Sequence, residues 1–384
     1  MDPSPIYLDN NATTPVDPRV ARAIRPVLEE NFGNPSSAHS YGRKARAAVT
    51  RAREQVAELL GCSADEIVFT SGASESNNLA LKGAAFHRRG GHILTSSIEH
   101  PSVLGSCRFL EDLGFARTTL LPVDATGRVQ PDQVAEAVGP DTILVSIMHS
   151  NNEIGTLQPI EEIAAWARER GVLFHVDAAQ SIGKVPVRVR ELGVDLLSVA
   201  GHKFYAPKGI GALYVREKSP LSPLIHGAGH ERGRRAGTEN VPYIVGLGEA
   251  CRLAGSDLEA ETQRLRQLRD RLWERLSRDL KDRVVLNGHP QLRLPNTLSL
   301  NFVGTTGAEL LSRCPEVAAS TGPACHDGVV RLSHVLEATG VSPELGKGAV
   351  RLSLGRFTAE NEVDRAAASL ARAFHESTAA QASP

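Results

Sequence analysis

The sequence predicts an α/β fold with a large domain, built on a mostly parallel sheet flanked by helices, and a smaller α+β domain. Between residues 117 and 182 the order is strand, helix, strand, helix, strand, with Gly or Pro at each joint. This alternation is typical of a parallel sheet covered by helices. Several apolar runs end on polar residues, as strands do at the ligand site of such a sheet. The chain has 384 residues, which is enough for two domains.

Composition excludes several classes of function. The 43 Lys and Arg residues against 44 Asp and Glu give a net charge of −1, so no direct binding of nucleic acid is expected from overall charge. The best apolar run, at 142–148, is too short to cross a bilayer, and residues 1–5 lack the pattern of a secretory signal. Five scattered cysteines without a C-x-x-C pair indicate a reducing, cytoplasmic setting with no disulfide framework or zinc site.

The first expected strand, at 66–70, follows helices at 20–30 and 43–60 and precedes a turn of small residues. The turn, Gly72, Ala73 and Ser74, opens another helix. It would present free backbone N–H groups and a positive dipole end, and could therefore hold a phosphate. A plain helix N-cap fits the same pattern equally well. Strands at 92–96 and 142–148 then lead into polar segments that contain His100 and Asn152.

Two later strands end on residues of opposite charge. The apolar run from Gly171 ends at Asp177, and the run 194–199 leads into Gly201 and then Lys203. A lysine considered alone is most often solvated at the surface. An acid and a lysine at the carboxyl ends of two nearby strands, however, suit pyridoxal phosphate (PLP). This cofactor needs a lysine amine for its Schiff base and an acid against its pyridinium nitrogen.

The remaining chain predicts a strand at 209–215, a Gly- and Arg-rich loop at 226–240, strands at 296–302 and 349–354, and a helix at 360–374. The loop's arginines either bind an anion or are simply solvated. Ser256 and Glu259 have the spacing of a capping box that opens a long helix, whose leucine stripe indicates core packing. We therefore expect a large domain at 14–255 and a small domain at 1–13 and 256–384.

Cys325 lies among small, turn-forming residues, and three interpretations compete for it. A buried, inert cysteine is the commonest case, but the Gly and Pro neighbours argue against burial. A metal site with His326 and Asp327 is disfavoured because adjacent residues rarely converge on one ion, so no metal is expected. A catalytic nucleophile is the interpretation that the PLP pair favours. The other four cysteines lie in or beside regular elements and are taken as structural: Cys62, Cys107, Cys251 and Cys314.

From Tyr7 to about Phe374 the chain resembles the cysteine desulfurases of the NifS/IscS type, class V aminotransferase-like enzymes of PLP fold type I. The matching motifs are Leu8–Pro15, Phe32–Ser37, Thr70–Ser76, Glu99–Pro101, His175–Gln180, Gly201–Lys203, Arg234–Asn240 and Arg351–Phe357. The resemblance implies that L-cysteine is converted to L-alanine while its sulfur passes to Cys325 as a persulfide. A sulfur-acceptor protein, for instance in iron–sulfur cluster assembly, would then receive it.

The resemblance also implies individual roles. Lys203 would bind PLP and then act as a base, Asp177 would pair with the pyridinium nitrogen, and Gln180 would hydrogen-bond the phenolic oxygen. His100 would stack on the ring and relay protons. The phosphate would be held by Gly72, Ala73, Ser74 and His202 of the same subunit. Thr238 of the partner subunit in a homodimer would complete this site. The substrate carboxylate would be bound by Asn152 and Arg351.

Some positions depart from the family pattern. Ala200 stands where many relatives carry a hydroxyl, a contact that Ser198 could replace, and Pro323, His326 and Asp327 alter the surroundings of the nucleophile. Selenocysteine lyase is a close alternative, because it shares these motifs. A PLP aminotransferase or β-lyase without a persulfide is a more distant one. A non-catalytic PLP-fold subunit is a third, against which the retained site residues argue.

Overall fold

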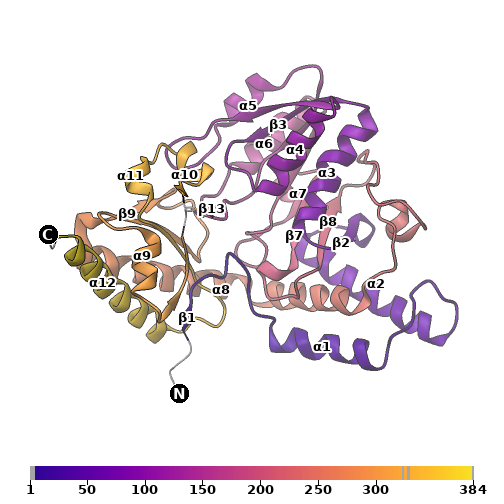
Figure 1. Ribbon diagram of the computed structural model, residues 1–384. Helices are drawn as coiled ribbons and strands as arrows, with labels where there is room; N and C mark the ends of the chain where they lie inside the picture. The colour runs from indigo at the N-terminus through magenta and orange to yellow at the C-terminus, as the bar shows by residue number, and fades with distance from the viewer. Residues whose placement is uncertain (1–4, 322–323, 327–328, 383–384) are drawn as a thin grey trace.

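The computed structural model describes residues 5–321, 324–326 and 329–382; the side chains of residues 322–331 and 380–382 are outside the described part. Its helices and strands form two bodies that are bridged by one long helix, α8 (Val241–Leu280) (Figure 1). The amino-terminal strand β1 (Ile6–Tyr7) pairs in parallel with β11 (Val317–Ala318), so both ends of the sequence contribute to the smaller body.

The larger body is built on a seven-stranded sheet in the order β2-β8-β7-β6-β5-β3-β4. All neighbouring pairs from β7 to β4 are parallel, whereas β8 runs antiparallel to both β7 and β2, which confirms the mostly parallel sheet. The strands are β2 (Ile67–Thr70), β3 (Gly91–Ser96), β4 (Ala116–Leu121), β5 (Thr142–Ser146), β6 (Leu173–Asp177), β7 (Leu196–Ala200) and β8 (Gly211–Val215).

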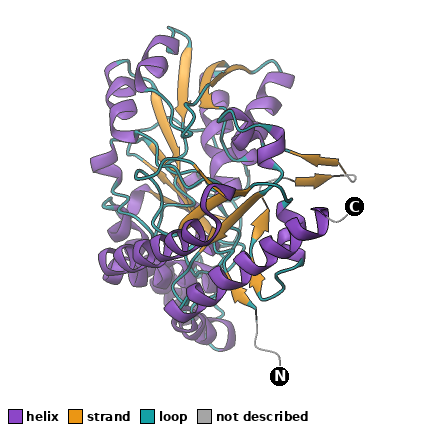
Figure 2. Ribbon diagram, turned by 90° about the vertical axis from the view of Figure 1, so that its left-hand side faces the viewer, coloured by secondary structure: helices purple, strands orange, loops and turns teal. Residues whose placement is uncertain are grey.

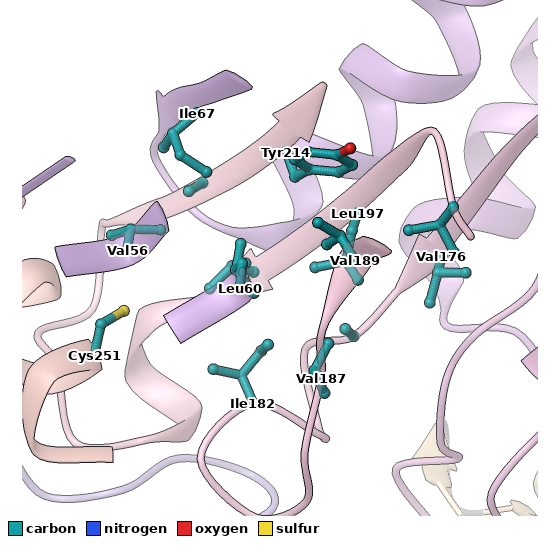
Figure 3. Close-up of a cluster of buried hydrophobic side chains, with 14 of the residues drawn as sticks. Val56, Leu60, Ile67, Val176, Ile182, Val187, Val189, Leu197, Tyr214 and Cys251 are labelled. Atoms are coloured by element: carbon teal, nitrogen blue, oxygen red, sulfur yellow. The ribbon is translucent and has the colours of Figure 1, made fainter. Parts of the chain in front are cut away.

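Helices cover both faces of this sheet, which explains the nearly continuous apolar strands. Successive residues of a strand point to opposite faces of the sheet and therefore pack in two different hydrophobic cores. Leu197 belongs to one of these cores and Leu196 to the other. Helices α3 (Ala73–Arg88) and α4 (Pro101–Asp112) cover the Leu196 face. The opposite face is covered by α2 (Ser40–Leu60), α5 (Pro131–Ala137), α6 (Ile160–Glu169) and α7 (Val189–Leu192). Figure 3 shows part of this second core, where Leu60 packs near Leu197 and Tyr214.

The smaller body contains a four-stranded antiparallel sheet in the order β12-β15-β10-β9. Its strands are β12 (Ser320–Thr321), β15 (Ala349–Ser353), β10 (Thr297–Phe302) and β9 (Val284–Asn287). The second half of α8 and helix α12 (Glu360–Ala382) pack against it, and buried leucines of α8, such as Leu268 and Leu272, join that core. The leucine stripe is therefore core packing, as predicted.

Helix α8 corrects one expectation. It begins after Asn240, whose Oδ1 accepts from the N–H of Tyr243, and it continues unbroken through Ser256. The Ser256 hydroxyl donates to the carbonyl of Leu253 inside the helix, so the predicted capping box is wrong. The division at residue 255 itself stays a prediction. One hydrophobic cluster ends at Ala254 and another resumes at Leu265, which supports a boundary within α8.

Short elements complete the fold. They are α1 (Pro18–Glu29), α9 (Gly307–Ser312), α10 (His334–Ala338), α11 (Pro343–Gly346), β13 (Ala324–His326) and β14 (Val329–Arg331). Strands β13 and β14 pair antiparallel, with Cys325 opposite Val330, and project from the body of the molecule (Figure 2). No helix in the described part of the chain combines the length and the apolar character needed to cross a membrane.

Candidate active site

A cavity of about 480 Å³ lies where the carboxyl ends of β5, β6 and β7 meet the amino-terminal segment and β15. Most of the predicted site residues line it: Gly72, Ala73, Ser74, His100, Asn152, Asp177, Gln180, His202, Lys203 and Arg351. The topology explains this convergence, because the parallel strands all end at the same edge of the sheet.

Lys203 reaches the cavity from the 3₁₀ turn Gly201–Lys203, directly after β7. Its Nζ donates to the carbonyl oxygens of Asn11 at 2.6 Å and Ala12 at 2.8 Å. Burial, and next the positive charge of Arg351, lower the pKa of Lys203 to about 8, although Asp177 acts in the opposite direction. The amine therefore loses its proton far more readily than a solvated lysine does.

Asp177 is connected to His100 through two intervening side chains. Asp177 Oδ2 accepts from Asn77 Nδ2 at 2.7 Å, and the same nitrogen donates to Ser102 Oγ at 2.8 Å. Both the Ser102 hydroxyl, at 2.8 Å, and the Ser102 N–H, at 3.1 Å, contact His100 Nδ1. Since the N–H can only donate, Nδ1 is an acceptor and the neutral ring carries its proton on Nε2. Burial lowers the pKa of His100, which keeps the ring neutral near pH 7.

The start of α3 forms a cradle at another side of the cavity. Its N-cap is Gly72, at φ +154°, which has no side chain to cap the helix. A Cβ built there meets nothing within 4 Å, so the turn is open to the cavity. Nearby, His202 Nδ1 contacts Thr13 Oγ1 at 3.1 Å, and burial together with the charge of Lys203 lowers the pKa of His202 to about 4. An uncapped helix start beside a neutral imidazole favours an anion ligand over a plain N-cap.

Arg351 provides a positive group at the opposite wall. It lies on β15, where its Nη2 donates to Asp9 Oδ1 at 2.8 Å and its Nη1 to the carbonyl of Asn152 at 3.1 Å. Its Nε is buried and has no hydrogen-bond partner among the described residues. A guanidinium that lines a cavity is suited to bind a carboxylate there.

Two predicted residues are not brought to this cavity by the described part of the chain. Thr238 lies beside Phe32 and Asn34 in a separate cavity of about 280 Å³, and its predicted role requires a second subunit. Cys325 has a described backbone in β13, but its side chain is outside the described residues, as are Pro323 and Asp327. Both roles stay predictions.

The structure shows that Ser198 does not supply a hydroxyl to the cavity, and it shows which acids pair with two arginines of the loop at 226–240. The Ser198 hydroxyl is buried and contacts His175 Nε2 at 3.0 Å, and Ser198 is not among the described residues that line the cavity, so it does not replace the hydroxyl missing at Ala200. In the loop, Arg232 pairs with Asp65. Arg235 pairs with Glu75 at 2.9 Å, in the first turn of α3.

Sequence reasoning missed several polar residues that hold the site together. Asn77 contacts Asp177, 100 residues away, Asn11 contacts Gln180, 169 residues away, and Asp9 pairs with Arg351. Lys184, four residues after Gln180, is buried against it. The spacing of four from Gln180 to Lys184 was the available signal, since two residues so placed in a helical turn lie side by side.

The four other cysteines are poor nucleophiles in the structure. Cys107, Cys251 and Cys314 are buried and Cys62 is partly buried. Burial raises the pKa of Cys62 and Cys107 to about 12 and that of Cys314 to about 11, and it also raises the pKa of Cys251. A thiol reacts as the thiolate, so these groups are inert near neutral pH. Within the described residues, no cluster of three or more His, Cys, Asp or Glu side chains could hold a metal ion.

The chain is similar to known proteins along nearly its whole length. The aminotransferase class-V family matches residues 6–366. The cysteine desulfurase IscS of Dictyoglomus turgidum is 48% identical over 363 residues, which are 94% of this chain and 92% of that protein. A NifS-like protein of known structure superposes with a TM-score of 0.90 at 39% identity, covering 97% of this chain and all of the other. SspA in complex with cysteine gives 0.81 at 42% identity, covering 92% and 100%. The chain therefore belongs to the aminotransferase class-V family, in its branch of NifS/IscS-type cysteine desulfurases.

Proposed function

We propose that this protein is a PLP-dependent cysteine desulfurase, a sulfurtransferase that converts L-cysteine to L-alanine and places the sulfur on Cys325 as a persulfide. The observation that carries the proposal is the meeting of Lys203, Asp177 and an uncapped helix start in one cavity, in a chain about half identical to IscS enzymes. The atoms of this reaction balance. The sulfur atom that cysteine loses becomes the outer sulfur of the Cys325 persulfide, and the rest of the substrate leaves as alanine.

The residues present fit PLP. The start of α3, with Gly72, Ala73 and Ser74, offers free N–H groups to a phosphate, and His202 lies beside it. Asp177 offers a buried carboxylate to a ring nitrogen, and Lys203 offers an amine with a lowered pKa. When bound, PLP would supply an electron sink for the carbon that loses its proton. Family membership confirms this cofactor expectation.

Lys203 is the group in the structure best able to move the substrate's α-proton. Its amine faces the cavity from a buried turn, and its pKa of about 8 is close to physiological pH. A base works best when its pKa lies near the working pH, because enough of it is unprotonated while it still accepts a proton strongly. The carbonyls of Asn11 and Ala12 hold the ammonium form after the proton has been taken.

His100 and Arg351 fix the orientation of what enters the cavity. The neutral His100 ring, held by Ser102 at Nδ1, leaves its protonated Nε2 edge free to donate. Arg351 and Asn152 line the cavity and would contact a carboxylate there. An amino acid held by its carboxylate at Arg351 would then place its amine in the cavity that Lys203 also lines.

Cys325, which lies on the projecting β13–β14 hairpin, would receive the sulfur. The inert chemistry of the other four cysteines supports this choice. The hairpin would carry the sulfur away from the cavity to an acceptor protein. Iron–sulfur cluster assembly, the role suggested by the IscS name of the relatives, is the proposed destination.

The proposed assembly is a cytoplasmic homodimer in which Thr238 of the partner subunit completes the phosphate site. Exposed aromatic residues support a covered surface in this region: Phe32, which lines the same cavity as Thr238, is 73% exposed, and Tyr41, whose ring centroid lies 5.4 Å from that of Phe32, is 52% exposed. Large exposed apolar groups of this kind mark interaction surfaces.

Replacement of the proposed nucleophile tests this function. We expect the purified protein with PLP to release alanine from L-cysteine, and Cys325→Ser to lower that rate by at least about 100-fold. Full activity in Cys325→Ser would instead show a β-lyase or aminotransferase without a persulfide. Faster turnover of selenocysteine, with little from cysteine, would identify a selenocysteine lyase. A protein that shows no visible cofactor absorbance after addition of PLP would revive the non-catalytic subunit.

A further inference from the structure

A second lysine, Lys184, lies buried behind the wall of the cavity. Its side chain is 6% exposed, and its Nζ donates to Gln180 Oε1 at 3.0 Å and to Asn11 Oδ1 at 3.3 Å. The charged groups that act on it most strongly, Lys203 and Arg351, are both cations. Burying an amine among cations costs free energy that two neutral amide oxygens offset only in part. Such a residue needs an explanation beyond packing.

Contacts with Lys184 and with the carbonyl of Asn11 decide how the side chain of Gln180 is oriented. A glutamine amide has one oxygen that accepts and one nitrogen that donates two hydrogen bonds. The oxygen of Gln180 accepts from Lys184 Nζ at 3.0 Å. The nitrogen Nε2 donates one hydrogen to the carbonyl of Asn11, which can only accept, at 3.0 Å. Gln180 lines the cavity, so its second N–H is left for a group bound there.

Asn11 ties the two lysines to one another. Its backbone carbonyl accepts from Lys203, and its Oδ1 accepts from Lys184. Its Nδ2 donates to Thr297 Oγ1 at 2.8 Å and to the carbonyl of Asn152 at 3.2 Å, and the carbonyl, which can only accept, prevents the amide from turning over. Asn11 is 1% exposed, so no solvent competes for these bonds. The arrangement of Asn11, Gln180 and Lys184 is therefore fixed as a unit.

We propose that Lys184 is a positioning residue that holds the amide of Gln180 with its N–H edge toward the cavity, so that Gln180 always donates to the phenolic oxygen of PLP. The inference rests on the proposed function and adds a residue to it. Without Lys184, only the Asn11 carbonyl holds the amide, and a turned amide would place its oxygen against the negative phenolic oxygen, which is repulsive. The donor stabilises negative charge on the phenolic oxygen and so favours loss of the proton from the nitrogen that joins the cofactor to Lys203.

The test is a pH titration of the visible absorbance of bound PLP in Lys184→Met, whose side chain has a similar length but no donor. We expect the titration midpoint to rise by about one pH unit, because the phenolic oxygen loses its fixed donor. Methionine also removes a charge near Lys203, His202 and Arg351, which acts in the same direction. Lys184→Met is therefore also made in a Gln180→Leu background. If Lys184 acts through Gln180, the change produces a smaller shift there, which is the part due to the lost charge alone.

The controls separate this inference from the proposed function. Lys347→Met removes an exposed lysine and should leave the midpoint unchanged. If Lys184→Met does not fold, judged by thermal unfolding, Lys184→Gln keeps a donor and is expected to shift the midpoint only by the part due to the lost charge, which is less than the shift in Gln180→Leu. An unchanged midpoint in Lys184→Met, or the same shift in both backgrounds, overturns the inference while the proposed function stands. A protein that binds no PLP overturns the proposed function itself.

Discussion

The two walls of the cavity hold their polar groups in different ways. On the wall formed by the large sheet, Asp177, Asn77, Ser102 and His100 are linked by hydrogen bonds within one body of the protein. On the opposite wall, Arg351 takes its position from Asp9 and the Asn152 carbonyl. Groups linked within one body are suited to a ligand that stays bound, whereas the Arg351 cation at the cavity is suited to a carboxylate that comes and goes. The sheet wall should therefore control kcat, and the opposite wall should control KM.

Removal of Lys203 should produce the largest effect. We expect Lys203→Ala to lower kcat by about 1,000-fold or more, because the protein loses both the amine that binds PLP and the base that moves the proton. The rate of alanine release from L-cysteine measures this. Thermal stability should not fall, since the change removes a partly buried amine whose pKa is lowered by burial. A loss of less than tenfold would mean that another residue is the base.

Arg351→Met should separate the two walls. We expect KM for L-cysteine to rise by about 10- to 100-fold with a much smaller change in kcat, because a charge-assisted hydrogen bond to the carboxylate is lost. Steady-state kinetics over a range of cysteine concentrations checks this. The surface pair Arg271 and Asp364 provides a matched control, and Arg271→Met should change neither constant. If Arg351→Met lowers kcat alone, the assignment of the walls is wrong.

The pH dependence of cofactor binding probes how the walls influence each other. Only the unprotonated amine reacts with PLP, and burial and Arg351 lower the pKa of Lys203 to about 8. The rate at which cofactor-free protein combines with PLP should therefore rise with pH and level off above about 8. Arg351→Met removes a neighbouring cation and should move this rise to higher pH. A rise centred near 10.5, the ordinary value for lysine, would contradict the lowered pKa.

The smallest effect is expected at the structural cysteines. Cys107 is buried in the core of the large sheet, and burial raises its pKa to about 12. Cys107→Ala should leave alanine release within about twofold of the unmodified protein and cost about 1 kcal/mol of stability from the lost packing. Activity assays and thermal unfolding measure the two quantities. A large loss of activity in a folded Cys107→Ala would contradict the assignment of this cysteine as a structural residue.

The parts of the molecule that could be predicted are those set by local pattern. The strands that end near Asp177 and Lys203 were recognisable because strands covered on both faces are apolar throughout. The start of the long helix was not, because Ser256 and Glu259 have the spacing of a cap although the helix continues through them. Asn11 and Asn77 could not be assigned from local pattern, since an asparagine's partners in a buried network are decided by tertiary packing.

Sulfur transfer to one thiol, that of Cys325, is the central step of the proposed function. The direct measurement is to incubate the PLP-loaded protein with ³⁵S- or ³⁴S-labelled L-cysteine and to map the labelled persulfide by mass spectrometry. We expect the label on Cys325, with none on Cys62, Cys107, Cys251 or Cys314, whose thiol pKa values are raised by burial. Label on any of those four residues, or alanine release without labelled protein, would contradict the proposed function.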